Sequence, residues 1–411
     1  MVVAVAPSAP RFEHRTDASP VLGVNDSAPR LSWTVPEAAP SYEQTSYEVE
    51  ITRDGRSDRY RVDSVEQVLV PWPAEPLASR DAAAVRIRVA HKDEWSGWSE
   101  TAVVEAGLLD SADWTADFVS PARLGGINMP APVLRGSLIV PGEVRKARLY
   151  ATAHGTYVPT LNGRRVGDDV LAPGWTSYRH RLRYQVYDVT DLVHDGENAL
   201  EVLLGNGWYR GRLGFHGQRA LYGDRLALLA QLEVTTTDGR VHVLATDGSW
   251  TARESEVLAD DLYDGQLTDL RRRGGGWRPA TDRVEVVGGD RARLVAPQGP
   301  PVRVTDVLPA RRVWTSPTGR TLVDFGQNVV GWVRLEVRDL SPGDEVVVRH
   351  AEVLEDGELS TRPLRSAQAT DTYFVAGGKE EVLEPSLTFH GFRYAEVDGA
   401  TGCAPRISRR S

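Results

Sequence analysis

The chain has 411 residues, too many for one ordinary hydrophobic core, so its length predicts two to four domains. Charged residues make up 26% and hydrophobic residues 41%, as in globular proteins, and the net charge of -9 disfavours a nucleic-acid-binding surface. The single cysteine, Cys403, excludes an intrachain disulfide and a metal site built from cysteines.

The first residues, MVVAVAPSAPRFEHR, lack the basic segment of a secretory signal. No apolar run approaches the roughly 20 residues that a membrane-spanning helix needs. We therefore expect a cytoplasmic protein without a membrane partner.

The predicted elements are strands along the whole chain. In SYEVEITRDG, the apolar Tyr47, Val49 and Ile51 alternate with polar residues, and AVRIRVAHKDEWSGWSE repeats this alternation. VTTTDGRVHVLATDGSW is typical of two strands joined by the hairpin dipeptide Asp238-Gly239. GWVRLEVRDLSPGDEVVVRHAEV predicts a similar strand pair around a Pro-Gly turn. Because no amphipathic helix longer than about three turns is evident, the sequence predicts an all-β chain.

Composition and turns divide the chain into three consecutive β-sandwich modules. Residues 1–112 form a small sandwich that ends in a Trp-rich strand, and residues 113–296 form a larger one. Residues 297–400 form a third, which starts at the Pro-rich APQGPPVRV. Residues 254–270 are the least regular part, and residues 401–411 are expected to be a tail.

Several collinear motifs resemble one known family. They are APRLSW, YEVEI, SGWSE, the long segment ARLYATAHGTYVPTLNGRRVGDDVLAPGWTSYRHRLRYQVYDVTDLV, LGNGWYRGRLGF, YGDRLALLAQLEV, DFGQNVVGWVRLEV, RHAEVLEDGEL and FHGFRYAEV. In this order they resemble the N-terminal β region of bacterial α-L-rhamnosidases of glycoside hydrolase family 78, from about residue 20 to 399. The resemblance implies a fibronectin- or immunoglobulin-like domain, then a jelly-roll domain, then a β-sandwich that packs on the catalytic domain.

The resemblance also implies an activity. Members of the family hydrolyse terminal α-L-rhamnose from glycosides by inversion, with carboxylates of an (α/α)6 barrel that follows these β domains. Inversion needs an acid and a base roughly 6.5–9.5 Å apart, and no position in this sequence matches the carboxylates of the barrel. We therefore assign no catalytic residue and expect the chain alone to be inactive.

What remains is an accessory region of an α-L-rhamnosidase, which binds carbohydrate or positions a catalytic domain. Two alternatives stay open. One is a stand-alone, lectin-like protein that binds rhamnose, and the other is a structural adaptor for a separately encoded barrel. The expected ligands are L-rhamnose or rhamnosylated glycosides.

Two aromatic stretches, residues 170–193 and 203–215, are candidates for sugar binding. A pyranose stacks its C–H face on Trp or Tyr, while its hydroxyls pair with Asn, Asp or Arg. Trp175 and Trp208 are the candidate platforms. The candidate hydroxyl partners are Asp168, Asp169, Asn206 and Arg210. The alternative is that the tryptophans plug the ends of a sandwich and that NGWYRG is a structural turn.

The segment VGDDVLAPGW is a candidate calcium site. In a related rhamnose-binding module of the family, calcium touches the sugar and is held partly by an adjacent pair of Asp or Asn residues. Asp168 and Asp169 stand in the corresponding place, which the resemblance implies as metal ligands. Calcium takes about six to eight oxygen ligands, so the pair would need further donors. The alternative is a polar turn.

The third module carries polar residues that a lone sandwich does not need. They are Asp324, Gln327, Asn328, Arg362, Arg365 and Asp371. Because the resemblance places this region against the barrel, we expect a domain interface here rather than contact with substrate. Trp332 and Phe392 should then be partly exposed in a chain without the barrel, and should promote self-association.

Overall fold

The computed structural model describes residues 5–16, 20–36, 42–92, 94–214, 216–273 and 281–400, and the backbone of 404–410. Strands dominate these residues, and their one α-helix, α1 (Gly207–Arg210), has four residues. The prediction of an all-β chain is therefore confirmed. The remaining helical turns are the 3-10 helices η1 (Ser111–Asp113), η2 (Thr190–Leu192), η3 (Leu270–Arg272), η4 (Arg291–Arg293) and η5 (Arg362–Leu364). Across the described ranges, we find no helix with the length and apolar character that crossing a bilayer demands.

The chain folds into two compact units. The first unit combines residues 1–115 with two later segments, 183–186 and 290–301, and the second unit comprises the rest. The first returning segment packs through Tyr184, whose hydroxyl accepts the N–H of Leu108 and donates to its carbonyl, and in the second the N–H of Ala296 donates to Asn25. The Tyr184 ring meets Trp114 edge-on at 5.1 Å. Each module predicted from the sequence is one continuous segment, so none of them includes segments that return from later in the chain.

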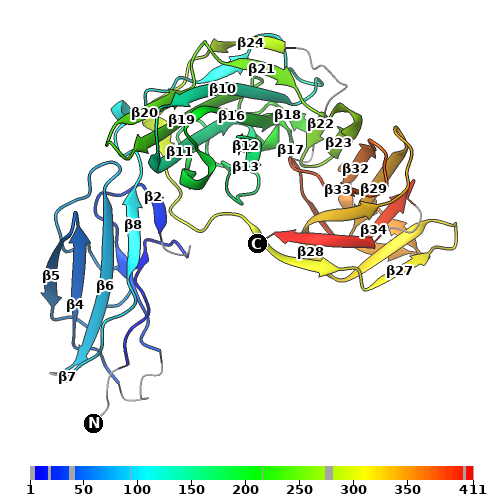
Figure 1. Ribbon diagram of the computed structural model, residues 1–411. Coiled ribbons are helices and arrows are strands. Elements are labelled where there is room, and N and C mark those ends of the chain that lie inside the picture. Colours follow the sequence, from blue (N-terminus) through cyan, green and yellow to red (C-terminus); the bar gives the residue numbers. More distant parts are fainter. Residues whose placement is uncertain are drawn as a thin grey trace. The chain divides into compact units, whose positions relative to one another are not determined.

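The first unit is built around a six-stranded sheet of the described residues. Its order is β2–β8–β6–β4–β5, with β7 on β6, and β1 pairs with β3 beside it (Figure 1). The strands are β1 (Arg11–Phe12), β2 (Val21–Val24), β3 (Leu31–Ser32), β4 (Ser46–Arg53), β5 (Arg56–Val62), β6 (Ala82–His91), β7 (Glu94–Trp95) and β8 (Ala102–Ala106). As the alternation predicts, Val49 and Ile51 of β4 face Ile87 and Val85 of β6 in the core.

The second unit begins with an 11-stranded sheet of the described residues. Its order is β13–β12–β16–β10–β21–β24–β9–β19–β11–β15, with β20 on β19. The strands are β9 (Val119–Pro121), β10 (Pro132–Val140), β11 (Val144–His154), β12 (Thr156–Leu161), β13 (Arg164–Arg165), β15 (Gln185–Asp188), β16 (Gly196–Gly205), β19 (Ala227–Thr236), β20 (Val241–Ala245), β21 (Thr251–Glu254) and β24 (Thr281–Val286). The hairpin predicted at Asp238-Gly239 is confirmed between β19 and β20.

One aromatic side chain decides the packing of this second sheet. Trp250 is fully buried and donates its indole N–H to the carbonyl of Ala245. It lies directly on Gly136 of β10, where an added Cβ would come within 2.3 Å of the indole. Only glycine leaves room for this contact, because the two inner faces pack at the density of a crystal.

A ten-stranded sheet of the described residues forms the last part of the second unit. Its order is β22–β23–β32–β29–β34–β28–β35–β26, and β27 and β33 also pair with β28. The strands are β22 (Val257–Asp261), β23 (Gly265–Asp269), β26 (Val304–Pro309), β27 (Arg312–Thr315), β28 (Thr321–Val337), β29 (Glu345–Ala351), β32 (Thr370–Phe374), β33 (Glu381–Leu383), β34 (His390–Asp398) and β35 (Ala404–Arg410). Short strands elsewhere are β14 (Leu182–Arg183), β17 (Arg212–Leu213), β18 (Gln218–Arg219), β25 (Leu294–Val295), β30 (Val353–Glu355) and β31 (Glu358–Ser360).

Three details of this sheet differ from the sequence-based expectations. Strands β28 and β29 do not form the expected hairpin around Pro342-Gly343, because β34 lies between them and pairs with both. Residues 404–410 form strand β35 on β28 and β26, where a tail was expected. The irregular stretch near residue 260 supplies β22 and β23, and β23 runs parallel to β32 (Figure 1). Period-2 alternation predicts that a strand forms, but it does not choose the partner.

The expected exposure of Trp332 and Phe392 is wrong. Their exposed fractions are 6% and 0%. Trp332 packs with Val170, Leu171 and Leu262, which come from the middle of the chain, and donates its indole N–H to Glu384 at 2.6 Å. The middle segment thus covers Trp332, and the expected self-association through Trp332 loses its basis.

Candidate functional site

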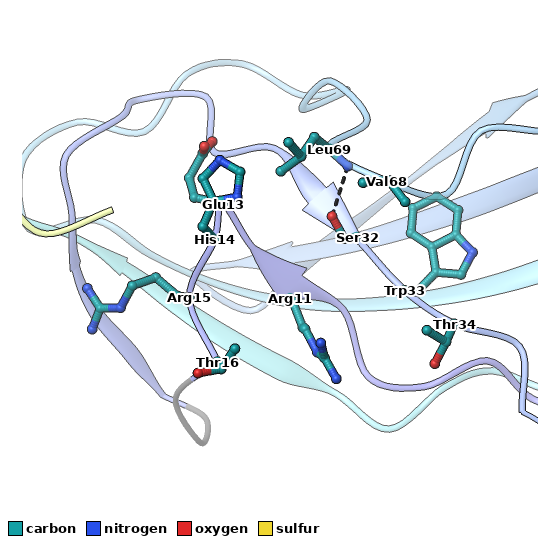
Figure 2. Close-up of a pocket in the computed structure, with 10 residues that line it drawn as sticks. All are labelled: Arg11, Glu13, His14, Arg15, Thr16, Ser32, Trp33, Thr34, Val68 and Leu69. Carbon is teal, nitrogen blue, oxygen red and sulfur yellow. Dashed lines mark hydrogen bonds between the residues drawn. The ribbon is translucent and has the colours of Figure 1, made fainter. Parts of the chain in front are cut away.

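The first unit holds a cavity of about 340 Å³ near its N-terminal strands and another of about 460 Å³ lined by β4, β5 and residues 74–75. Figure 2 shows side chains from three parts of the chain around the first cavity, including Arg11, Trp33 and Leu69. The Ser32 hydroxyl accepts the N–H of Leu69 at 2.8 Å and joins the second of these parts to the third. None of the residues predicted for sugar binding lines this cavity.

A larger cavity, about 560 Å³, lies in the second unit. Asp168, a predicted site residue, lines it together with Arg165, Arg273 and Glu384, while Trp332 supplies an apolar wall. A cavity of this size accommodates a small sugar, and planar charged groups beside an apolar wall suit a polyhydroxyl ligand. Trp175 is not among its lining residues, so the structure separates the predicted platform from the predicted acid pair.

The predicted metal pair is held by an arginine. The Nε atom of Arg303 lies 2.7 Å from Oδ1 of Asp168 and 3.9 Å from Oδ1 of Asp169. Arg165 donates to the backbone carbonyl of Asp169 at 2.9 Å, and the Asp169 carboxylate hydrogen-bonds the buried Tyr187. Two guanidinium groups therefore stand where a cation would be attracted. This donor set does not fit calcium, and the function proposed below needs none.

The two tryptophans that were predicted as stacking platforms, Trp175 and Trp208, lie beside each other. Their rings are stacked at a centroid distance of 6.4 Å with an angle of 6° between the planes. The Trp175 N–H donates to the Tyr222 hydroxyl at 3.2 Å, and Trp208 packs in turn on Phe389. Trp208 is half-buried, but 53% of Trp175 is exposed. We call Trp175, Trp208 and Tyr222 the aromatic shelf.

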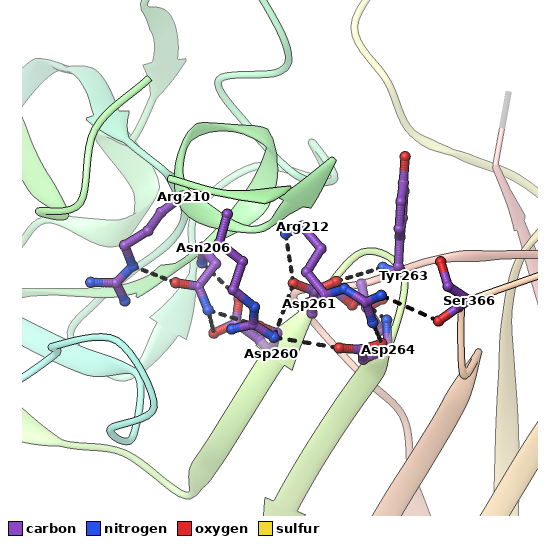
Figure 3. Close-up of polar contacts among 10 residues, drawn as sticks. Asn206, Arg210, Arg212, Asp260, Asp261, Tyr263, Asp264 and Ser366 are labelled. Atoms are coloured by element: carbon purple, nitrogen blue, oxygen red, sulfur yellow. Dashed lines mark hydrogen bonds and ion pairs between the residues drawn. The ribbon is translucent and has the colours of Figure 1, made fainter. Parts of the chain in front are cut away.

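Asn206 and Arg210 serve the interior instead (Figure 3). The Asn206 side chain donates to the carbonyl of Asp260 at 2.7 Å and accepts from Arg210 Nε at 2.5 Å. Arg210 is buried and also donates to the carbonyl of Gly125 at 2.6 Å. Their polar atoms thus fix helix α1 to β22, and we do not carry them into the proposed sugar site.

Sequence reasoning missed the acidic side of this network. Burial raises the pKa of Asp260 to about 7, although the N–H of Asn206 and the charge of Arg210 act to lower it. The buried Asp261 accepts the backbone N–H of Arg212 at 2.8 Å. The Arg212 side chain pairs with Asp264 and donates to the carbonyl of Ser366 (Figure 3).

The only sequence pattern that could have indicated these buried acids is the motif ADDLYDG, residues 259–265. Three acids beside an irregular stretch indicate a turn by composition. Their burial depends on Arg210 and Arg212, about 50 positions earlier in the chain. No local pattern links two such segments.

Most polar residues of the third module also find partners within the second unit. Asp324 forms a two-point contact with Arg393 at 2.9 and 3.0 Å. Asn328 donates to Glu352 at 2.9 Å, and Arg362 pairs with Glu355 at 3.1 Å. Gln327 is exposed on β28, and Arg365 ends η5 with a φ of 57°. Asp371 is buried between two histidines.

Three family models match the chain in sequence order. Residues 7–110 match the Rha78A-like, N-terminal immunoglobulin domain, residues 142–306 match the alpha-L-rhamnosidase N-terminal domain, and residues 314–409 match the bacterial alpha-L-rhamnosidase concanavalin-like domain. Together these models cover almost the whole chain.

Relatives agree with these matches. An alpha-L-rhamnosidase of Streptomyces avermitilis is 44% identical over 310 residues, which make up 72% of this chain and 30% of the relative. The solved structure of the rhamnosidase of Aspergillus terreus has a TM-score of 0.93 and 38% identity, covering 98% of this chain and 49% of that one. A Streptomyces avermitilis rhamnosidase solved with L-rhamnose has a TM-score of 0.88 and 28% identity, covering 98% and 57%. The chain thus spans between about a third and somewhat over half of these relatives' lengths.

Proposed function

Because this chain carries the N-terminal domains of the bacterial α-L-rhamnosidase family, we propose that it works in the hydrolysis of terminal α-L-rhamnose from glycosides. Its own part is to bind the sugar and to position the domain that performs the reaction. The collinear match of three domains supports the first statement. The aromatic shelf supports the second.

The single observation that carries sugar binding is the exposure of Trp175. Its ring is half exposed although it is the largest apolar side chain in its loop. The Tyr222 hydroxyl and the Trp208 ring fix its orientation, so the outer face is presented as a flat surface. A ring whose orientation is already fixed loses little conformational entropy when a ligand stacks on it. Even a ligand that makes few contacts can therefore bind.

L-Rhamnose suits such a surface. It is a 6-deoxy sugar, so a methyl group replaces a hydroxymethyl group and enlarges the apolar part that can stack on an indole. A neutral monosaccharide lacks charged groups, so we expect a Kd near the millimolar range, about -4 kcal/mol. Asp168 remains a candidate hydroxyl partner at the larger cavity, where Arg303 holds its carboxylate.

The test is a titration of the purified chain with L-rhamnose, followed by tryptophan fluorescence and by ligand-observed NMR. Trp175→Ala should weaken binding about two- to tenfold, because one aromatic stacking contact is worth about 0.5–1.5 kcal/mol. Trp175→Phe should retain part of the affinity, because a flat ring remains. Ile139→Ala, which removes an exposed apolar side chain of β10 outside the shelf, should leave binding unchanged.

The length of the related chains supports a second role for the aromatic shelf. Since these chains extend well beyond the matched region, a further domain could cover Trp175 instead of a sugar. The same titration separates the two roles. Absence of any rhamnose signal at tens of millimolar sugar would reject sugar binding and would leave domain positioning as the function of the shelf.

A further inference from the structure

Three buried side chains of the third module converge on one point without any role in the function above. His350 lies on β29, Asp371 on β32 and His390 at the start of β34. These three strands are neighbours in the sheet, in the order β32–β29–β34. One nitrogen or oxygen from each residue lies within 4.8 Å of the others, and all three side chains are buried.

The separations match those of ligands around a small metal ion. Nε2 of His390 lies 3.2 Å from both oxygens of Asp371, and Nε2 of His350 lies 3.9 Å from Oδ2. Zinc takes nitrogen and oxygen ligands at about 2.0–2.2 Å in a tetrahedral arrangement, which sets the ligand atoms roughly 3.3–3.5 Å apart. Of these separations, only the one between His350 and Asp371 exceeds that range, so binding would draw His350 toward Asp371.

The hydrogen bonds around the cluster already orient the ligand atoms. Nδ1 of His350 lies 2.9 Å from the carbonyl of Ala369, so Nδ1 carries the proton and Nε2 presents its lone pair. The backbone N–H of Gln266 donates to Oδ1 of Asp371 at 2.9 Å. Histidines that bind metal usually donate their other ring N–H to such a carbonyl, and ligating carboxylates are hydrogen-bonded in the same way.

His350 supplies a second, independent observation. Its Nε2 atom is buried and has no hydrogen-bond partner. This nitrogen lies 3.9 Å from Oδ2 of Asp371 in the protein interior, while Nδ1 of the same ring faces the carbonyl of Ala369. Two acceptors that face each other are destabilising unless a cation lies between them.

We propose that His350, Asp371 and His390 form a buried structural site for a divalent transition metal, with zinc as the fitting ion. The two imidazoles give two nitrogens, and both oxygens of Asp371 are within reach of a fourth position. The site is closed, so it stabilises the fold and performs no chemistry. Binding displaces the proton that His390 Nε2 shares with Asp371, and the proton leaves with the solvent. Calcium and magnesium, which prefer six or more oxygens, do not suit this set.

Such an ion would join four strands. Its ligands lie on β29, β32 and β34, and the Gln266 N–H connects the Asp371 carboxylate to β23. β23 comes from the middle of the chain and pairs in parallel with β32. The site would thus hold β23, near the edge of the sheet, to the strands that carry the ligands. Because the site is buried, exchange of the ion would be slow.

The test uses the full chain, unfolded with a chelator and refolded with or without Zn²⁺ or Co²⁺. Refolding with zinc should retain one equivalent after gel filtration, measured by mass spectrometry of the metal, and should raise the melting temperature. Cobalt should give the visible absorption of a four-coordinate ion. His350→Phe should weaken binding at least about 100-fold, because loss of an outer hydrogen bond alone already costs about 10–100-fold.

His154→Phe is the matched control, because this histidine is also stacked between aromatic rings, Phe118 and Tyr209, but lies outside the cluster. It should retain the full equivalent of zinc. The wild-type chain decides the question even if a variant fails to fold. Less than a tenth of an equivalent of zinc, no cobalt absorption and an unchanged melting temperature would overturn the proposal.

Discussion

Two buried aspartates of the second unit have pKa values shifted in opposite directions, for reasons that the structure makes plain. Burial raises the pKa of Asp260 to about 7, since its partners are amide groups and Arg210 only acts from nearby. Burial acts on Asp371 in the same sense, but the charge and hydrogen bond of His390, together with His350, lower its pKa below the usual value. Burial alone therefore does not decide ionisation, because a direct imidazole partner outweighs it.

The largest effect should come from removing the ionised member of this pair. Asp371→Ala leaves His390 and the N–H of Gln266 without their buried acceptor. We expect the free energy of unfolding to fall by about 3–5 kcal/mol, as for other broken buried charge pairs. Urea unfolding followed by near-ultraviolet circular dichroism measures it. A loss below about 1 kcal/mol would mean that Asp371 is not the centre of this cluster.

Asp260, whose pKa is raised, should make the stability of the protein depend on pH. The folded pKa of Asp260, about 7, lies above its unfolded value near 3.8, so the folded state binds the extra proton between these values. Its contribution is present below about pH 4 and is lost as pH rises to about 7, by up to about 4 kcal/mol. Asp260→Asn, which cannot ionise, should flatten this part of the curve of unfolding free energy against pH. Parallel curves for the two proteins would contradict the assignment.

A smaller effect should follow when the cation near Asp260 is removed. Arg210→Gln takes away a charge that lowers the pKa of Asp260 and leaves the carbonyl of Gly125 without its donor. We expect a loss of about 1–3 kcal/mol from the unsatisfied buried carbonyl. We also expect a higher pKa for Asp260, read from the carboxyl carbon by NMR titration. A pKa that stays near 7 would show that Arg210 does not set the charge of this site.

The smallest effect should occur at an exposed carboxylate. The Asp168 side chain is 69% exposed although its ion pair with Arg303 is only 2.7 Å long. Solvent screens such a pair, so Asp168→Asn should change the free energy of unfolding by less than about 1 kcal/mol. Thermal unfolding at low and high salt measures it. A loss as large as that of Asp371→Ala would refute the rule that burial and direct partners together set the size of these effects.

Local sequence patterns were sufficient for the strands and the domain family. Alternation at Val49 and Ile51, and the Asp238-Gly239 turn, predicted elements that the structure confirms. Collinear motifs identified the family, because long strings of residues match by chance very rarely. These inferences depend on neighbours in the sequence, which a pattern can read directly.

Contacts between distant segments decided the rest. The sequence indicated Trp175 and Trp208 as platforms, but only the fold stacks them and leaves one of them exposed. It indicated Arg210 as a sugar partner, whereas Asp260, 50 residues later, holds its network inside the protein. Trp332 is buried because a loop from the middle of the chain covers it. Burial, charge state and partner are set by which segments meet, and a residue's neighbours in sequence do not contain that information.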